Sequence, residues 1–197
     1  MKTTGFLAIL ALIFVFQSAN ARELSPGTIM ITGETSFDDS KIRMDTSYSQ
    51  LVTDTTTLDV TASYFLIKNF GVGLMIGNED SRTTDGVNTT NTSINISGPM
   101  AVYSIDINPD FNINFSLGIF KVTGDMDDGA GTALEFDGDG TFILLSVAYF
   151  FNDNVALNIG IRRTDGDIEL YNRFLANPPE SASMSDNGNM IGFMFLF

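Results

Sequence analysis

The chain contains no cysteine, no histidine and no tryptophan among its 197 residues. Without histidine or cysteine it cannot carry a Ser-His-Asp or Cys-His nucleophile system, a zinc site built on those ligands, a disulfide or a thiolate redox centre. Basic residues are also scarce, because 10 Lys and Arg stand against 24 Asp and Glu, for a formal net charge of −14. Phosphate binding needs clustered Lys and Arg, so nucleic acid is not an expected partner. These absences favour a protein without catalytic activity and without a cofactor.

Apolar residues are plentiful. Hydrophobic residues make up 44% of the chain and include 17 Phe, and the mean hydropathy is +0.14 although the chain is acidic. That much apolar surface can offset the conformational entropy lost on folding, which argues against disorder. The fold must therefore keep its apolar residues apart from its charged ones.

The first 21 residues read as a secretory signal peptide. Lys2 supplies a basic start, an apolar run follows from Phe6 to Phe16, and Ala19 and Ala21 form a small-residue cleavage site. A membrane anchor is the alternative, but the run is shorter than the roughly 20 residues that span a bilayer as a helix. We expect cleavage after Ala21, with residues 22–197 forming one domain.

Alternation of apolar with polar or small residues dominates from Thr28 onward. Over residues 111–119, for example, Phe, Ile, Phe, Leu and Ile alternate with Asn, Asn, Ser and Gly. A period of two indicates strands with one apolar face. The pattern predicts an all-β fold with eight strands near residues 28–37, 57–67, 70–78, 92–104, 111–122, 141–150, 155–163 and 190–197.

The connections between these strands are of two alternating kinds. Tight turns are predicted near residues 68–69, 108–110 and 152–154. Long acidic loops are predicted over about 38–56, 78–91, 124–140 and 163–189. An even strand number, with both termini on the side of the short turns, is typical of an eight-stranded antiparallel up-and-down transmembrane β-barrel.

A secreted, lipocalin-like carrier is the soluble alternative, because such a barrel also has eight antiparallel strands. It would hold its apolar face inside, whereas a membrane barrel turns that face to lipid. The end of the chain favours the membrane barrel, since Ile191, Phe193, Phe195 and Phe197 form one unbroken apolar face on the last strand. A terminal strand of this kind is poorly suited to water.

The signal peptide, the hairpin Tyr64–Gly77 and the terminal aromatic strand together resemble the outer-membrane β-barrel domain family, the small OmpA- and OmpX-like barrels of Gram-negative bacteria. The resemblance implies a monomer in the cell outer membrane, surrounded by lipid and lipopolysaccharide. It also implies that the barrel assembly machinery reads the last strand, with Gly192, Phe195 and Phe197 as the insertion signal. Family members serve as adhesins, stress proteins, complement-resistance factors or narrow channels, so membership leaves the role open.

Charged residues within the predicted strands form a first group of candidates. Glu34, Asp59 and Arg162 fall on the polar face, where a narrow lumen would force them to pair and fill it. An ion or proton pathway is the alternative function for these residues. Lys121 and Arg163 share the parity of the lipid face, where they would meet lipopolysaccharide phosphates or reach to the membrane interface.

A second group of candidates lies in the acidic stretch 124–140. Oxygen ligands suit Ca²⁺, so this stretch is a candidate site for divalent cations. EF-hand spacing fails here, because the positions that should hold the invariant glycine and the last carboxylate hold Ala130 and Phe136. A solvated acidic loop is the alternative. The candidate ligands are Asp125, Asp127, Asp128, Asp137 and Asp139, together with Glu135.

The sequence therefore predicts an outer-membrane barrel with a structural or surface-interaction role: envelope integrity, or binding of ions or partners through the loops. A narrow channel for small solutes or ions is the first alternative function, and the lipocalin-like carrier is the second.

Overall fold

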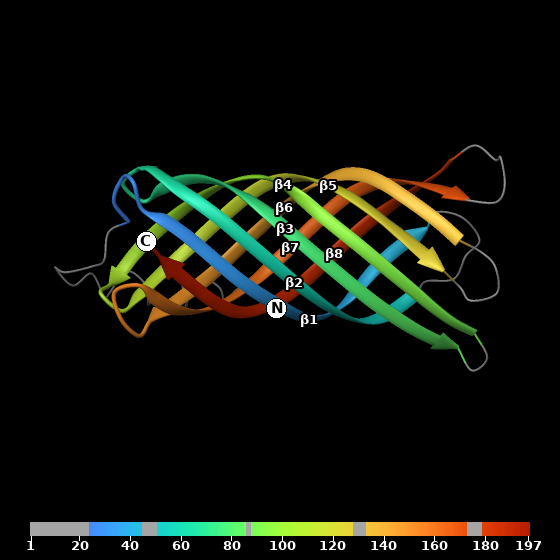
Figure 1. Ribbon diagram of the computed structural model, residues 1–197, viewed down its shortest axis with the longest axis horizontal. Coiled ribbons are helices and arrows are strands. Elements are labelled where there is room, and N and C mark those ends of the chain that lie inside the picture. The colour runs from blue at the N-terminus through green and yellow to red at the C-terminus, as the bar shows by residue number, and fades with distance from the viewer. Residues whose placement is uncertain (1–23, 45–50, 86–87, 128–132, 173–178) are drawn as a thin grey trace, which may run out of the picture.

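The computed structural model describes residues 24–44, 51–85, 88–127, 133–172 and 179–197. These residues form eight strands that pair antiparallel in sequence order, and β1 pairs with β8 to close the barrel (Figure 1). The predicted fold class and strand number are confirmed. The strands are β1 (Ile29–Met44), β2 (Leu51–Ile67), β3 (Phe70–Asp85), β4 (Asn88–Asn108), β5 (Phe111–Asp127), β6 (Ala133–Phe150), β7 (Val155–Asn172) and β8 (Glu180–Leu196).

The strands are steeply staggered around the barrel. Following the register from Glu34 through all eight strands leads back to β1 at Met44, ten residues further along the same strand. Such a stagger requires the strands to tilt against the barrel axis, as Figure 1 shows. Residues that are paired in register therefore lie at different heights in the lumen.

The three tight turns lie where the sequence predicts them. Asn69 adopts a left-handed conformation, with φ of 60°, between β2 and β3, and asparagine tolerates that conformation better than most residues. At the other two turns an asparagine side chain accepts backbone hydrogen bonds. Asn108 accepts from the N–H of Asp110 at 2.9 Å, and Asn152 accepts from the N–H of Asn154 at 2.8 Å. These Asx-type bonds explain why the turns are short.

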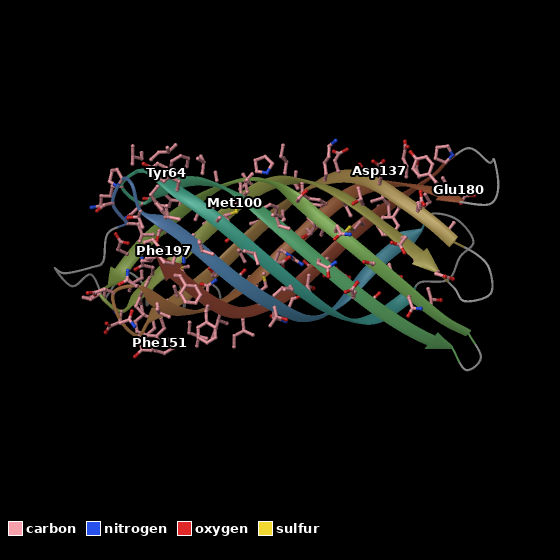
Figure 2. All side chains as sticks on the ribbon, viewed as in Figure 1. Tyr64, Met100, Asp137, Phe151, Glu180 and Phe197 are labelled. Atoms are coloured by element: carbon pink, nitrogen blue, oxygen red, sulfur yellow. The ribbon has the colours of Figure 1, made fainter. Side chains whose placement is uncertain are left out.

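A belt of apolar side chains covers the outside of the barrel at the end that carries the tight turns. Leu58, Leu74, Ile76 and Ile119 are each at least 60% exposed. In Figure 2, Tyr64, Phe151 and Phe197 lie at this end, as expected for the aromatic girdle of a membrane barrel. A lipocalin-like barrel would hold its apolar face inside, so that alternative is wrong. The aromatic members of the belt are Tyr64, Tyr103, Phe111, Phe115, Tyr149, Phe151, Phe193, Phe195 and Phe197.

Beyond the belt the strands continue, and the prediction of long acidic loops is wrong over most of their length. β5 runs to Asp127 and β7 to Asn172, so much of the predicted loop sequence is paired strand. Strands of 16 to 21 residues exceed the roughly 9–11 residues that cross a bilayer. The barrel therefore protrudes from the membrane as a wall whose outer face is acidic, with Asp137 and Glu180 at that end in Figure 2.

The residues that line the lumen differ between the two halves of the barrel. Inside the belt the lumen is lined mainly by Ser, Thr, Asn and charged side chains, whereas inside the protruding wall it is lined by apolar ones such as Ile94, Phe136 and Ile168. The outer face changes in the opposite sense, because lipid surrounds one half and water the other. No helix among the described residues is long and apolar enough to cross a bilayer.

Candidate functional site: a filled lumen

A buried ion-pair network crosses the lumen inside the belt. Arg162 on β7 donates hydrogen bonds to Asp59 on β2 and, at 3.2 Å, to Asp186 on β8. All three side chains are at most 4% exposed. A guanidinium suits this position, because its two terminal nitrogens can each bind a different carboxylate. The network joins β7 to its neighbour β8 and, across the lumen, to β2.

A second polar contact lies beside this network. The Asn158 side-chain amide on β7 donates to the carboxylate of Glu34 on β1, although β8 lies between the two strands. Gly192 is the β8 residue that pairs with both in register. Because Gly192 has no side chain, the Asn158 amide can reach across β8 to Glu34. Gly192 therefore has a structural role in the folded barrel.

Aromatic rings fill the lumen at the height where the belt ends. Phe120 and Phe142 are at most 2% exposed, and glycines on neighbouring strands make room for them. A Cβ atom at Gly140 would lie 2.5 Å from the Phe120 ring, and one at Gly118 would lie 2.3 Å from the Phe142 ring. Such close approach indicates dense packing of the lumen at this height.

The other end of the lumen is capped by the segment that precedes β1. The N–H of Leu24 donates to the Asn69 side chain at 3.0 Å, and the Leu24 carbonyl accepts from the Asn69 N–H at 2.8 Å. Asn69 also donates to Asp106 at 2.7 Å. The Leu24 side chain, 2% exposed, joins the buried apolar cluster with Phe65 and Phe150. In the described part of the chain, this segment therefore closes the lumen at the end that carries the tight turns.

The three lumen candidates from the sequence face inward and lie in this network. Sequence reasoning missed their partners Asp186 and Asn158. Asp186 lies in a predicted loop, although it alternates with the buried residues Met184 and Met190. Asn158 belongs to the predicted inner face, but nothing in the sequence pairs it with Glu34, which is 124 positions away.

The acidic candidates lie on the outer wall, on two adjacent strands. Asp125 and Asp127 are on β5, Asp137 and Asp139 are on β6, and all four are exposed; Asp128 lies outside the described residues. Register pairs Asp139 with Lys121. The part of the chain that the structure describes brings no three acidic side chains close enough to hold one metal ion. Calcium binding by these residues stays a prediction.

The remaining candidates also lie on the outside. Lys121 is exposed on β5, and Arg163 on β7 binds Asp165 at 2.7 Å. This pair lies beyond the belt, and the guanidinium holds the pKa of the Asp165 carboxyl below its usual value.

Phe197 and Phe195 point outward from the last strand, and the Phe197 backbone exchanges two hydrogen bonds with Ile29, at 2.9 and 3.0 Å.

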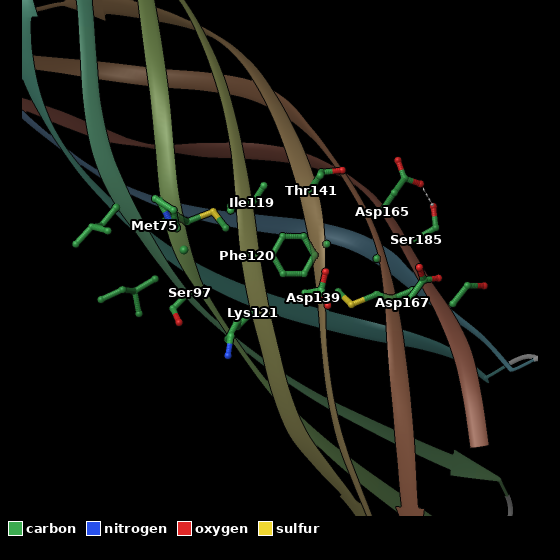
Figure 3. A pocket seen from close by; sticks show the side chains of 18 residues that line it. Met75, Ser97, Ile119, Phe120, Lys121, Asp139, Thr141, Asp165, Asp167 and Ser185 are labelled. Atoms are coloured by element: carbon green, nitrogen blue, oxygen red, sulfur yellow. Dashed lines mark hydrogen bonds between the residues drawn. The ribbon is translucent and has the colours of Figure 1, made fainter. Parts of the chain in front are cut away.

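A groove of about 1160 Å³ crosses the outer wall where the belt ends. Ile119 and Lys121 of β5, Asp139 of β6 and Asp167 of β7 are among the residues that line it (Figure 3). The Ser185 hydroxyl donates to Asp165 at 3.1 Å within it. The groove combines apolar and charged groups at the height where lipid headgroups meet the barrel.

Three solved structures share this architecture. The chain matches the outer membrane protein OprG from Pseudomonas aeruginosa with 19% identity and a TM-score of 0.58, over 88% of this chain and 97% of that one. It matches Neisserial surface protein A with 13% identity and a TM-score of 0.62, over 87% and 99%. It matches Ail of Yersinia pestis, in complex with the heparin analogue sucrose octasulfate, with 11% identity and a TM-score of 0.54, over 88% and 100%. At these identities the likeness concerns the fold alone.

No curated protein matches this chain. A family model does: the outer membrane protein beta-barrel domain matches residues 7–196. The match agrees with the closed eight-stranded ring, the apolar belt and the aromatic girdle. The chain therefore belongs to the outer membrane protein beta-barrel domain family and is a protein of the outer membrane.

Proposed function

We propose that this protein is a sealed scaffold of the outer membrane, which supports envelope integrity and presents an acidic wall at the cell surface, and that it catalyses no reaction. The observation that carries the proposal is the filled lumen. The Arg162 network, the packed rings of Phe120 and Phe142 and the cap around Leu24 all occupy the lumen. These three groups of buried side chains argue against the alternative of a narrow channel.

The protruding wall supports a role in surface contacts. Its outer face carries exposed carboxylates, among them Asp137, Asp167 and Glu169. Such a surface would repel a polyanion such as the heparin analogue in the Ail complex. Lipopolysaccharide is the expected neighbour at the groove, where Lys121 can meet a phosphate and divalent cations can bridge phosphates to the carboxylates.

Electrical recording tests whether the lumen is sealed. The refolded protein in a planar bilayer is expected to give no reproducible single-channel steps. A Phe120→Ala, Phe142→Ala double variant, which removes two rings from the lumen, serves as the matched comparison and should conduct more than the unmodified chain. Regular steps from the unmodified chain would overturn the sealed-lumen proposal in favour of the channel.

Dye uptake tests the role in envelope integrity. A strain that lacks the protein is expected to take up more of a fluorescent apolar dye than its parent, because a scaffold lost from the outer membrane leaves it more permeable. The unmodified chain should restore the barrier. A variant in which Asp137, Asp167 and Glu169 are changed to their amides keeps the barrel but removes charges from its outer wall. It distinguishes the contribution of the barrel from that of the charges. Equal uptake with and without the protein would contradict the envelope role.

Phe197→Ala tests the proposed insertion signal. The side chain is 70% exposed, and its backbone bonds to Ile29 do not need the ring. We expect slower assembly in cells, measured as the heat-modifiable fraction of the protein in outer membranes, but unchanged refolding in detergent. Phe151→Ala is the control, because Phe151 is an exposed aromatic residue of the same belt outside the last strand. Equal assembly of both variants would refute the signal.

A further inference from the structure

A narrow slot runs along β4 on the outer face of the belt. Its floor consists of Ser97, Pro99 and Ala101, which are small side chains on the outward face of the strand. Register places Ala101 between Val72 on β3 and Leu117 on β5. Because neighbouring strands lie about 4.8 Å apart, the two strands that form the walls are about 10 Å apart. The wall residues are Val72, Leu74 and Ile76 on β3 and Leu117, Ile119 and Lys121 on β5.

This β4 slot is continuous with the groove at the edge of the belt. Its apolar part is a second groove of about 690 Å³, which shares Leu74, Pro99 and Ile119 with the first one. Lipid surrounds the belt, so a hydrocarbon chain is the natural filling for an apolar groove there. The slot leads such a chain from the belt to the charged groups at its edge.

Three charged side chains stand in a row across that end of the slot (Figure 3). Register pairs Lys121 on β5 with Asp139 on β6, and Asp139 with Asp167 on β7. All three are exposed, and within the described part of the chain none of these side chains forms a hydrogen bond or an ion pair. Asp165, the other ionisable residue that lines the groove, is already bound by Arg163. The row therefore offers one positive and two negative charges to a ligand.

We propose that the β4 slot binds one phospholipid with a phosphoethanolamine headgroup. An acyl chain lies over the small floor, the phosphate contacts Lys121, and the ammonium contacts Asp139 and Asp167. A two-carbon linker separates phosphate from ammonium, a separation close to the spacing of adjacent strands. The ammonium has three donors for the two carboxylates, and the Lys121 ammonium can donate to the phosphate.

Charge complementarity favours this headgroup over an anionic one. Two carboxylates beside Lys121 repel a phosphate that has no neighbouring positive charge. The phosphates of lipopolysaccharide, the expected neighbour of the barrel, therefore need divalent cations to approach the row, whereas phosphoethanolamine brings its own cation. The slot lies on the outer face, so this inference does not depend on whether the lumen is sealed.

Lipid competition tests the proposal. The full mature chain is refolded in detergent and mixed with equal amounts of phosphatidylethanolamine and phosphatidylglycerol that carry the same acyl chains. Native mass spectrometry then counts the lipids that each barrel retains. We expect one phosphatidylethanolamine per barrel, retained about fivefold more than phosphatidylglycerol. A parallel sample offers lipid A in place of phosphatidylglycerol, with the same expected preference.

Two charge variants test how the headgroup is recognised. The double variant Asp139→Asn, Asp167→Asn should lose the preference, so that both phospholipids are retained equally. Lys121→Gln should lower the retention of both, because both carry the phosphate. These opposite effects on preference and on retention are not expected from a change in the stability of the barrel.

A third variant tests the slot itself. Ala101→Phe places a ring on the floor and should lower the retention of both phospholipids. Ala62→Phe is the matched control, because Ala62 is an outward alanine of the belt on β2 that lines neither groove. Heat-modifiability on a gel checks that each variant is folded. If Ala101→Phe fails to fold, the charge variants decide.

Four results would overturn the proposal. They are equal retention of the two phospholipids by the unmodified chain, a preference for lipid A, folded barrels that retain no phospholipid, and a dimer without lipid that loses its contact in Ala101→Phe. The last result would mean that a second copy of the chain covers the slot.

Discussion

Replacing Arg162 with methionine is expected to lower the free energy of unfolding by about 3–5 kcal/mol, the usual cost of breaking a buried ion pair from one side. Methionine keeps much of the length of the side chain, but it leaves Asp59 and Asp186 buried without their guanidinium. Urea unfolding of the refolded barrel in detergent at neutral pH measures the loss. The loss should shrink as the pH falls, because protonation neutralises the stranded carboxylates.

Two further variants complete the test. The double variant Arg162→Met, Asp59→Asn should be more stable than Arg162→Met alone, since it removes one of the stranded charges. Arg163→Met is the matched control, because Arg163 is the next residue along β7 but is exposed and paired with Asp165 on the outer wall. It should unfold at nearly the same urea concentration as the parent chain. Equal losses at positions 162 and 163 would mean that the lumen network contributes nothing to stability.

The barrel itself could be predicted from the sequence because lipid and lumen impose opposite demands on successive residues. Along residues 155–162 every second side chain is apolar, and the structure turns Ile159 and Ile161 outward and Asn158 and Arg162 inward. A strand of period two with one fully apolar face has few other environments. The asparagine-rich turns then fixed the pairing of neighbouring strands.

The protruding wall could not be predicted in the same way. In the segment 167–170, Asp167 and Glu169 point outward while Ile168 and Leu170 are buried. The alternation therefore continues, but here the outward residues are charged and the inward residues are apolar. Once a strand leaves the membrane, water replaces lipid outside and apolar side chains replace polar ones inside. Reading acidic residues and glycines as loops overlooked this exchange. The clue was a regular alternation of acidic and apolar residues.

The contacts within the lumen could not be predicted from the sequence, for a different reason. Asp59 and Arg162 lie 103 positions apart, and β2 and β7 are not neighbours in the barrel. Their meeting depends on the ten-residue stagger, which sets which inward residues share a height. Periodicity fixes the face of each residue, but it does not fix its height in the lumen.

Replacing Gly192 with alanine is also expected to destabilise the barrel, although less than Arg162→Met. A Cβ at this position would lie 2.0 Å from the carbonyl oxygen of Gly33 and 2.7 Å from the Cα of Glu34. Both are backbone atoms, so the clash cannot be relieved by turning a side chain. We expect a loss of about 1–3 kcal/mol in the free energy of unfolding, as for other overpacked sites, together with a disturbed contact between Asn158 and Glu34.

Gly33→Ala is the matched control for this prediction, because Gly33 lies next to Glu34 on β1 and a Cβ there would meet nothing within 4 Å. It should be neutral or stabilising by up to about 1 kcal/mol, since alanine loses less entropy than glycine on folding into a strand. Urea unfolding in detergent contains no assembly machinery, so a loss seen there belongs to the folded barrel. If Gly192→Ala instead unfolds like the parent chain and is defective only in cells, the glycine acts as part of the insertion signal.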